Sequence, residues 1–112
     1  MSTRRSDGKA VQVVVPNGQT WNYGDAVYAD GYAGIAQTSG AAGDVVALEI
    51  EAGAVHELTV GSSVAAAKGD LVYITTDGTN ALTASSSGTR LFGRVWRARD
   101  SNSVAWIRLA AQ

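Results

Sequence analysis

The sequence of 112 residues contains no cysteine, which removes disulfide bonds and thiolate metal sites from the features that could stabilise the fold. It has a single histidine, His56, so a zinc site would need three or more carboxylate ligands, an unusual ligand set. No window approaches about 18 consecutive apolar residues, so we expect no membrane-spanning helix. Arg4 and Arg5 have no apolar stretch behind them, so we expect no secretory signal.

Charged residues are also few, at 17% of the chain, and the net charge of −1 argues against a general nucleic-acid-binding protein. The two signs of charge are unevenly placed. Residues 1–89 carry four Lys or Arg and nine Asp or Glu, a net −5, whereas residues 90–112 carry five Arg and one Asp, a net +4. This asymmetry fits either contacts between subunits or charge cancellation inside one fold.

The patterns that are present predict strands and turns. Val11–Val15 alternates apolar and polar side chains, and Val45–Glu51 does so most clearly, as expected of half-buried strands. Thirteen glycines predict many turns, and Asp77–Asn80 predicts a hairpin turn. We expect an all-β fold, a compact small barrel or sandwich forming a single domain over residues 11–112. Residues 1–10 are polar, and we expect a flexible arm that orders on a partner or a terminus with no role.

Two stretches of the chain echo each other: Tyr23–Tyr28 contains Gly-Asp followed by an apolar segment, and so does Lys68–Tyr73. Glycine suits a turn with positive φ, and aspartate can accept hydrogen bonds from nearby backbone N–H groups. We infer two diverged copies of one β unit, which are too few for a solenoid; the alternative is chance similarity of short strands. The segments that follow the two copies are also alike: Ala33–Ala36 and Val45–Ile50 after the first, Phe92–Val95 and Val104–Leu109 after the second.

Two expectations concern which side chains are covered. Leu71–Ile74 has apolar residues on both faces, so we expect both faces of this strand to be covered. Trp21 and Tyr23 are two residues apart, so in an extended segment they would share a face as core or interface aromatics.

The last two predicted strands form a hairpin around the turn Asp100–Ser103. One register would place Arg94 opposite Arg108, which like-charge repulsion disfavours. A shift by one residue places Arg97 opposite Trp106, and we favour this register.

Arginine and aromatic side chains alternate in this hairpin. We expect Arg94 to lie between Phe92 and Trp96 on one face, and Arg108 lies beside Trp106 in the sequence. Such pairs can stack cation on ring, and both residue types are enriched where proteins meet proteins. The alternative is that the arginine stems pack over their own sheet.

The sequence offers no credible catalytic site. No G-x-S-x-G nucleophile elbow accompanies His56, which we expect to be a solvated or core histidine. Glu49 and Glu51 share a face of a strand, but paired acids on the wet side of a strand are common. We expect no enzyme, no cofactor and no metal site.

Five segments, in their order and spacing, resemble the small phage capsid cement or head-decoration proteins. They are Gly43–Glu51, Gly53–Leu58, Ala67–Tyr73, Leu91–Val95 and Val104–Leu109. The resemblance implies an all-β structural protein, a homotrimer, made in the bacterial host cytoplasm and placed on the outer surface of the expanded capsid. There it would bind the major capsid protein where subunits meet and strengthen the shell against internal DNA pressure, with no direct contact to nucleic acid or membrane.

This resemblance leads to two groups of candidate site residues. The residues expected to contact the capsid are Thr3, Arg4, Arg5 and Lys9. The residues expected in or near a subunit interface are Trp96, Arg97, Trp106 and Arg108. The alternative function is a glycan- or host-surface-binding β module displayed on a virion, in which exposed Trp and Tyr would form flat binding platforms.

Overall fold

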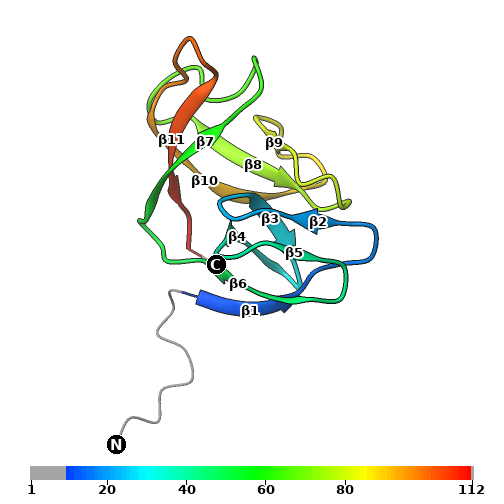
Figure 1. Cartoon of the computed structure of the whole chain (residues 1–112). Coiled ribbons are helices and arrows are strands. Elements are labelled where there is room, and N and C mark those ends of the chain that lie inside the picture. Colours follow the sequence, from blue (N-terminus) through cyan, green and yellow to red (C-terminus); the bar gives the residue numbers. More distant parts are fainter. Residues whose placement is uncertain (1–9, 112) are drawn as a thin grey trace, which may run out of the picture.

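Two curled antiparallel sheets and a short ribbon form residues 10–111, the part of the chain that this computed structural model describes (Figure 1). One sheet has the strand order β1-β6-β4-β3, the other β7-β11-β10-β8-β9, and β2 pairs with β5. The expected all-β fold is confirmed. The strands are β1 Ala10–Val14, β2 Thr20–Trp21, β3 Ala26–Ala29, β4 Tyr32–Ala36, β5 Gly40–Ala41, β6 Val45–Glu49, β7 Val55–Thr59, β8 Leu71–Thr75, β9 Leu82–Thr83, β10 Thr89–Arg97 and β11 Val104–Leu109.

The two sheets repeat one arrangement. The order β1-β6-β4-β3 is matched strand for strand by β7-β11-β10-β8, and β9 is an addition at the edge of the second sheet. We call residues 10–50 the first lobe and residues 51–111 the second lobe. The inferred pair of β units is therefore confirmed, and each unit begins one strand earlier than the sequence echo indicated, with β1 and β7.

The Gly-Asp turns that revealed the echo have the same local structure in both lobes. Gly24 and Gly69 have φ values of +89° and +94°, a region that glycine reaches without steric cost. Each following aspartate accepts a hydrogen bond from the backbone N–H three residues earlier, at 2.8 Å in the first lobe and 3.0 Å in the second. Each glycine N–H donates to a strand carbonyl, that of Ala36 in one lobe and that of Val95 in the other. These turns therefore fix the start of β3 and β8 in the same way.

Each lobe has its own apolar core, and strand β4 joins the two. The expected inward row of β6, Val46, Leu48 and Ile50, is buried in the first core beside Trp21. The second core contains side chains from β7, β8, β10 and β11, together with Ala33 and Ile35 of β4. Because Ala36 of the same strand packs in the first core, β4 contributes to both.

Strand β8 corrects one expectation. Val72 and Ile74 are fully buried, but Leu71 is 38% exposed and Tyr73 is half-buried. Both faces are apolar, yet only one is covered by the described residues. An apolar residue on a strand therefore did not identify the core face, because apolar side chains also occupy protein surfaces.

Trp21 and Tyr23 correct a second expectation, since they do not share an environment. Trp21 is 1% exposed in the first core, whereas Tyr23 is 73% exposed. Strand β2 ends at Trp21, and the chain turns at Tyr23 and Gly24. The alternation of side chains between the two faces of a strand therefore does not continue from Trp21 to Tyr23.

Asn80, in the turn between β8 and β9, links the second lobe to the first. Its Nδ2 donates to Gln19 Oε1 at 2.8 Å, and its Oδ1 accepts from the backbone N–H of Tyr28 at 3.1 Å. The same Gln19 oxygen accepts a hydrogen bond from the Trp21 indole at 2.9 Å. The hairpin turn expected at Asp77–Asn80 is confirmed, and its last residue also connects the lobes.

Replacing Asn80 with glycine is expected to lower the free energy of unfolding by about 1–3 kcal/mol, because part-buried polar groups lose their partners. Glycine keeps the positive φ that Asn80 adopts, +53°, so backbone strain does not enter the comparison. Urea unfolding followed by tryptophan fluorescence measures the change. Asn102→Gly, in an exposed turn, is the control and should change stability by less than about 0.5 kcal/mol. An equal effect of the two substitutions would show that Asn80 does not stabilise the contact between lobes.

Candidate functional site

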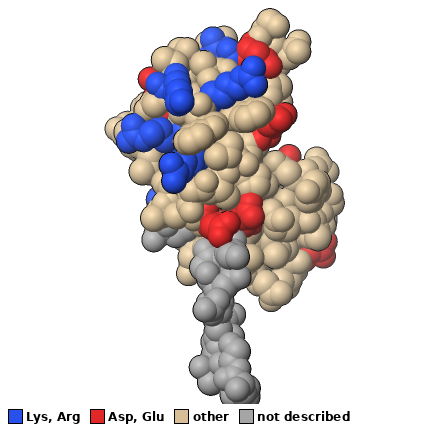
Figure 2. Space-filling view, turned by 90° about the vertical axis from the view of Figure 1, so that its left-hand side faces the viewer, with Lys and Arg blue, Asp and Glu red and all other residues tan. Residues whose placement is uncertain are grey.

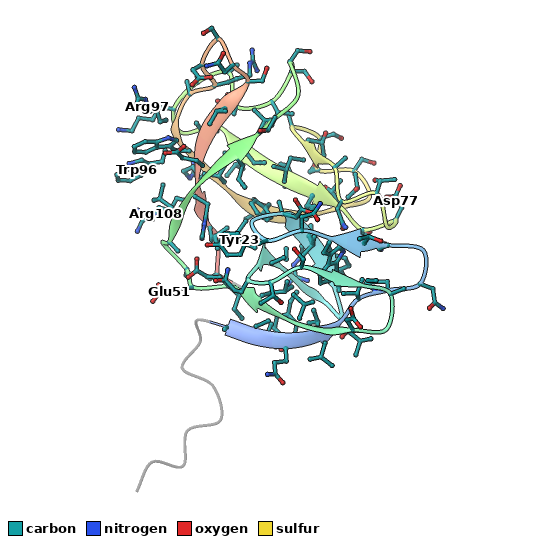
Figure 3. All side chains as sticks on the ribbon, viewed as in Figure 1. Tyr23, Glu51, Asp77, Trp96, Arg97 and Arg108 are labelled. Atoms are coloured by element: carbon teal, nitrogen blue, oxygen red, sulfur yellow. The ribbon has the colours of Figure 1, made fainter. Side chains whose placement is uncertain are left out.

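The four residues expected at a subunit interface lie together on the outer side of the second sheet. The Arg97 guanidinium lies 5.2 Å from the centre of the Trp106 ring, and that of Arg108 lies 5.7 Å from the Trp96 ring. Lys68, in the turn before β8, places its Nζ 5.3 Å from the same Trp96 ring. Figure 3 shows Trp96, Arg97 and Arg108 projecting on one side of the molecule, away from the ribbon.

We call this cluster the basic–aromatic surface. It consists of Lys68, Arg94, Trp96, Arg97, Trp106 and Arg108. In Figure 2, Lys and Arg side chains gather over the upper part of this face, and a separate group of acidic side chains lies below them. Trp96 is 45% exposed, and the same sheet carries further exposed apolar residues: Leu91 on the same strand, Leu71 on β8 and Val55 on β7. Exposed aromatic and apolar groups mixed with arginine are typical of protein interfaces.

The register of β10 against β11 explains how these side chains come together. Arg94 pairs with Arg108 and Val95 with Ile107, but beyond an irregularity Arg97 pairs with Trp106. The favoured pairing of Arg97 with Trp106 is therefore confirmed, but it does not exclude the pairing of Arg94 with Arg108. The two registers coexist because the extra residue, Trp96, forms a bulge that shifts the pairing along the hairpin.

The two opposed arginines reduce their repulsion by turning to different partners. The Arg94 guanidinium donates to the backbone carbonyl of Gly69 at 2.8 Å, on the β8 side. The Arg108 guanidinium lies over Trp96. The electrostatic argument against this pairing was thus wrong because it treated the side chains as pointing at each other.

A second irregularity corrects the expected position of Phe92. This side chain is fully buried in the second core, whereas Arg94 and Trp96 are exposed, so the three do not share a face. The pairing of β10 with β8 shifts between Leu91 and Gly93, which changes the face on which later residues of the strand lie.

The turn that closes this hairpin is held by Asp100. Its Oδ1 accepts hydrogen bonds from the backbone N–H groups of Asn102 at 2.8 Å and Val104 at 3.0 Å. These bonds, that of Val104 foremost, lower the pKa of the Asp100 carboxyl below its ordinary value, and the charge of Arg97 adds to the effect. Asp100 is therefore an ordered anion at the end of the basic–aromatic surface.

The residues expected to contact the capsid, Thr3, Arg4, Arg5 and Lys9, lie outside the described residues.

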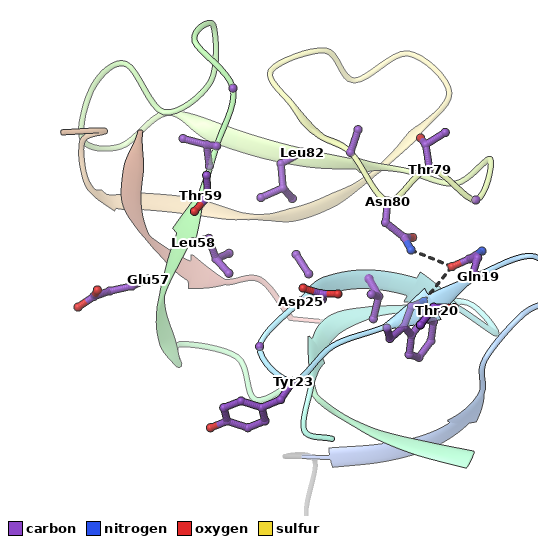
Figure 4. A pocket seen from close by; sticks show the side chains of 18 of the residues that line it. Gln19, Thr20, Tyr23, Asp25, Glu57, Leu58, Thr59, Thr79, Asn80 and Leu82 are labelled. Carbon is purple, nitrogen blue, oxygen red and sulfur yellow. Dashed lines mark hydrogen bonds between the residues drawn. The ribbon is translucent and has the colours of Figure 1, made fainter. Parts of the chain in front are cut away.

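Sequence reasoning did not find the open groove between the lobes, which has a volume of about 830 Å³. Its walls come from three segments, residues 18–27, 57–61 and 78–82 (Figure 4). Tyr23 and Glu57 lie toward one end of it, and the contact between Gln19 and Asn80 lies at the other. No local pattern could have indicated this groove, because it exists only where segments distant in sequence meet.

Two further findings concern chemistry and membranes. The imidazole of His56 contacts the Glu49 carboxylate, both side chains being partly exposed, so the histidine is neither isolated in the core nor fully solvated. Within residues 10–111, no group of three or more His, Asp or Glu side chains could hold a metal ion. No helix in the same range is long and apolar enough to span a membrane.

Comparison with protein families matches residues 5–110 to the family described as phage cement protein. This chain belongs to the phage cement protein family. No curated protein and no solved structure matches it in the corresponding comparisons. The family match covers both lobes, so the resemblance of the separate segments is confirmed.

Membership of this family establishes the cement protein's general role. It is a structural protein of the phage capsid that binds capsid proteins, and it is not an enzyme. The basic–aromatic surface and the groove are therefore considered below as binding surfaces.

Proposed function

We propose that this cement protein binds the outer surface of the expanded capsid, between subunits of the major capsid protein, and stabilises the shell against internal DNA pressure. The observation that carries this proposal is the match of residues 5–110 to the phage cement protein family. The basic–aromatic surface adds a candidate interface between subunits. Aromatic and arginine side chains supply most of the binding energy in many protein interfaces. Repetition over a capsid also makes modest contacts sufficient, because linked sites raise the effective concentration of each partner.

In this proposal two parts of the chain have different partners. Trp96, Arg97, Trp106 and Arg108 lie where subunits of a homotrimer meet. The N-terminal arm contacts the major capsid protein. Its contact residues are Thr3, Arg4, Arg5 and Lys9.

Co-sedimentation with expanded, undecorated capsids of the source virus tests the cement role and the arm together. The full chain should bind saturably, at a fixed ratio to the major capsid protein. Deleting residues 1–9 should weaken binding about tenfold or more through loss of cationic contacts. The unfolding transition should be unchanged, because the deletion ends before β1. Unchanged capsid binding by the truncated protein would remove the arm from the proposal, and absence of binding by the folded full chain would overturn the cement role.

The groove favours a second candidate function, binding of a glycan or host-surface carbohydrate. Tyr23 is largely exposed, and Asp25 and Thr59 also line the groove, whereas the side chain of Glu57 points away from it (Figure 4). Sugars bind to such combinations of an aromatic platform and hydrogen-bonding groups. Titration of intrinsic fluorescence with a panel of glycans should give saturable binding that Tyr23→Ala abolishes; a flat titration for every glycan would exclude this candidate.

A further inference from the structure

The first lobe has a net charge of −4, whereas the second has six Lys or Arg and five Asp or Glu, a net +1. Residues 10–67 contain no Lys or Arg at all, and the first lobe has only acidic charged side chains. Every lysine and arginine in the described part of the chain lies in the second lobe. They are Lys68, Arg90, Arg94, Arg97, Arg99 and Arg108. Charge of one sign on each of two surfaces favours contact between different surfaces of neighbouring copies.

The first lobe also has an exposed apolar patch on its outer face. Val14 of β1 and Val45 of β6 are cross-strand partners, and they are 49% and 61% exposed. Ala47 and Glu49 follow on the same face of β6, because Val46 and Leu48 between them are buried. We call this patch the acidic–apolar surface, and it consists of Gln12, Val14, Val45, Ala47 and Glu49, with Asp44 directly preceding β6.

This patch is the structural counterpart of the basic–aromatic surface. Strands β1 and β6 of the first lobe correspond to β7 and β11 of the second, and the registers match. Glu49, opposite Ala10, therefore corresponds to Arg108, opposite Val55. By the same alignment Ala47 corresponds to Trp106. The two faces share a backbone arrangement but carry different side chains. Where the basic–aromatic surface has Trp106 and Arg108, the acidic–apolar surface has Ala47 and Glu49, and Glu49 is 28% exposed and contacts His56 of the second lobe.

We propose that the basic–aromatic surface of one copy docks on the acidic–apolar surface of the next, so that this protein assembles head to tail. The inference rests on the proposed role of the basic–aromatic surface as a subunit interface, and it identifies the partner surface. A two-fold contact of the basic–aromatic surface with itself would bring the cations of one copy, Lys68, Arg94, Arg97 and Arg108, near the same group of cations in the other, which like-charge repulsion disfavours. Because the two surfaces belong to different lobes, each copy can use both at once, and a head-to-tail contact that closes forms a ring.

Charge exchange between the two surfaces tests this arrangement. The first variant, Arg97→Glu with Arg108→Glu, reverses charge on the basic–aromatic surface. The second, Gln12→Lys with Val45→Lys, adds positive charge to the acidic–apolar surface at two exposed positions. A third protein combines all four substitutions.

Sedimentation velocity of the full-length proteins, at low and at high salt, measures their self-association. The natural chain should associate, more strongly at low salt. Each two-site variant should associate about tenfold more weakly or worse, and the four-site protein should recover to within about threefold of the natural chain. Ser86→Lys with Ser87→Lys, in an exposed loop of the second lobe, adds the same charge as the second variant and should leave association unchanged.

Three results would overturn the proposal. They are a natural chain that stays monomeric, a four-site protein that does not recover, and a two-site variant that associates as strongly as the natural chain. Capsid co-sedimentation of the same proteins is scored separately. A natural chain that binds shells while remaining monomeric in solution would sink the head-to-tail contact and leave the cement role standing.

Discussion

Trp21→Ala is expected to lower the free energy of unfolding by about 4 kcal/mol, the largest effect of any single side-chain truncation considered for this protein. Trp21 is almost completely buried and is the largest side chain in the first core. Its removal leaves a cavity that Val13, Val27 and Leu48 cannot fill without moving. It also removes the indole N–H that donates to Gln19 Oε1. The same oxygen accepts a hydrogen bond from Asn80 of the second lobe. Thermal unfolding should therefore shift down by about 4–8 °C for each kcal/mol lost.

Trp96→Ala is the matched control for this prediction, since it removes the same side chain from an exposed site. The contacts of Trp96 are with the cations of Lys68 and Arg108, and exposed contacts of this kind contribute about 0.5–1 kcal/mol each. Measured on the monomer, its loss should therefore cost about 1–2 kcal/mol, clearly less than that of Trp21. If Trp96→Ala were as destabilising as Trp21→Ala, the assignment of Trp96 to a surface rather than to the core would be wrong.

Gly93→Ala is expected to destabilise the second lobe by about 3 kcal/mol through overpacking. A Cβ at this position would collide with the backbone carbonyl of Arg108 and would lie 2.9 Å from Ile107 Cγ2. The clash cannot be relieved by rotating a side chain, because the first obstacle is backbone of the adjacent strand β11. Gly34 of the first lobe has the equivalent contact with Glu49 of β6. Gly34→Ala should therefore destabilise the first lobe by a similar amount.

Gly61→Ala separates this steric effect from the general effect of replacing glycine. A Cβ at Gly61 meets no atom within 4 Å, and its φ lies outside the left-handed region. Alanine there should be neutral or should stabilise by up to about 1 kcal/mol, because it restricts the unfolded chain. Urea unfolding of the three alanine variants side by side makes the comparison. Equal stability of Gly93→Ala and Gly61→Ala would contradict the close approach of β10 to β11.

Gly34 and Gly93 also explain why the similarity between the two halves of the sequence was meaningful. Short apolar segments resemble each other often. Gly34 and Gly93, however, occupy equivalent places in the two sheets, and each leaves room for a backbone carbonyl of the adjacent strand, that of Glu49 or that of Arg108. Gly24 and Gly69 likewise adopt similar positive φ values and bond equivalent neighbouring strands, β4 in the first lobe and β10 in the second. These positions keep glycine in both lobes for a local physical reason, so the echo was visible although the surrounding side chains differ.

The composition and periodicity of the sequence determined the fold class, the two β units, the buried row of β6 and the Gly-Asp turns. Each of these depends on a few consecutive residues: a period of two, a positive φ, or a carboxylate that bonds its own turn. The clustering of Trp96, Arg97, Trp106 and Arg108 was also predictable, because one hairpin carries all four.

Only the tertiary structure decided where these local patterns are interrupted. The bulge at Trp96 lets two registers coexist, and the shift near Leu91 turns Phe92 into the core while Arg94 faces outward. A bulge depends on the strands on both sides of it, so the sequence of one strand does not specify it. Which face of β8 is covered, the groove between the lobes and the partners of Asn80 likewise depend on segments far apart in the chain. Local patterns determine the strands and turns of this protein, whereas its surfaces are determined by how those strands meet.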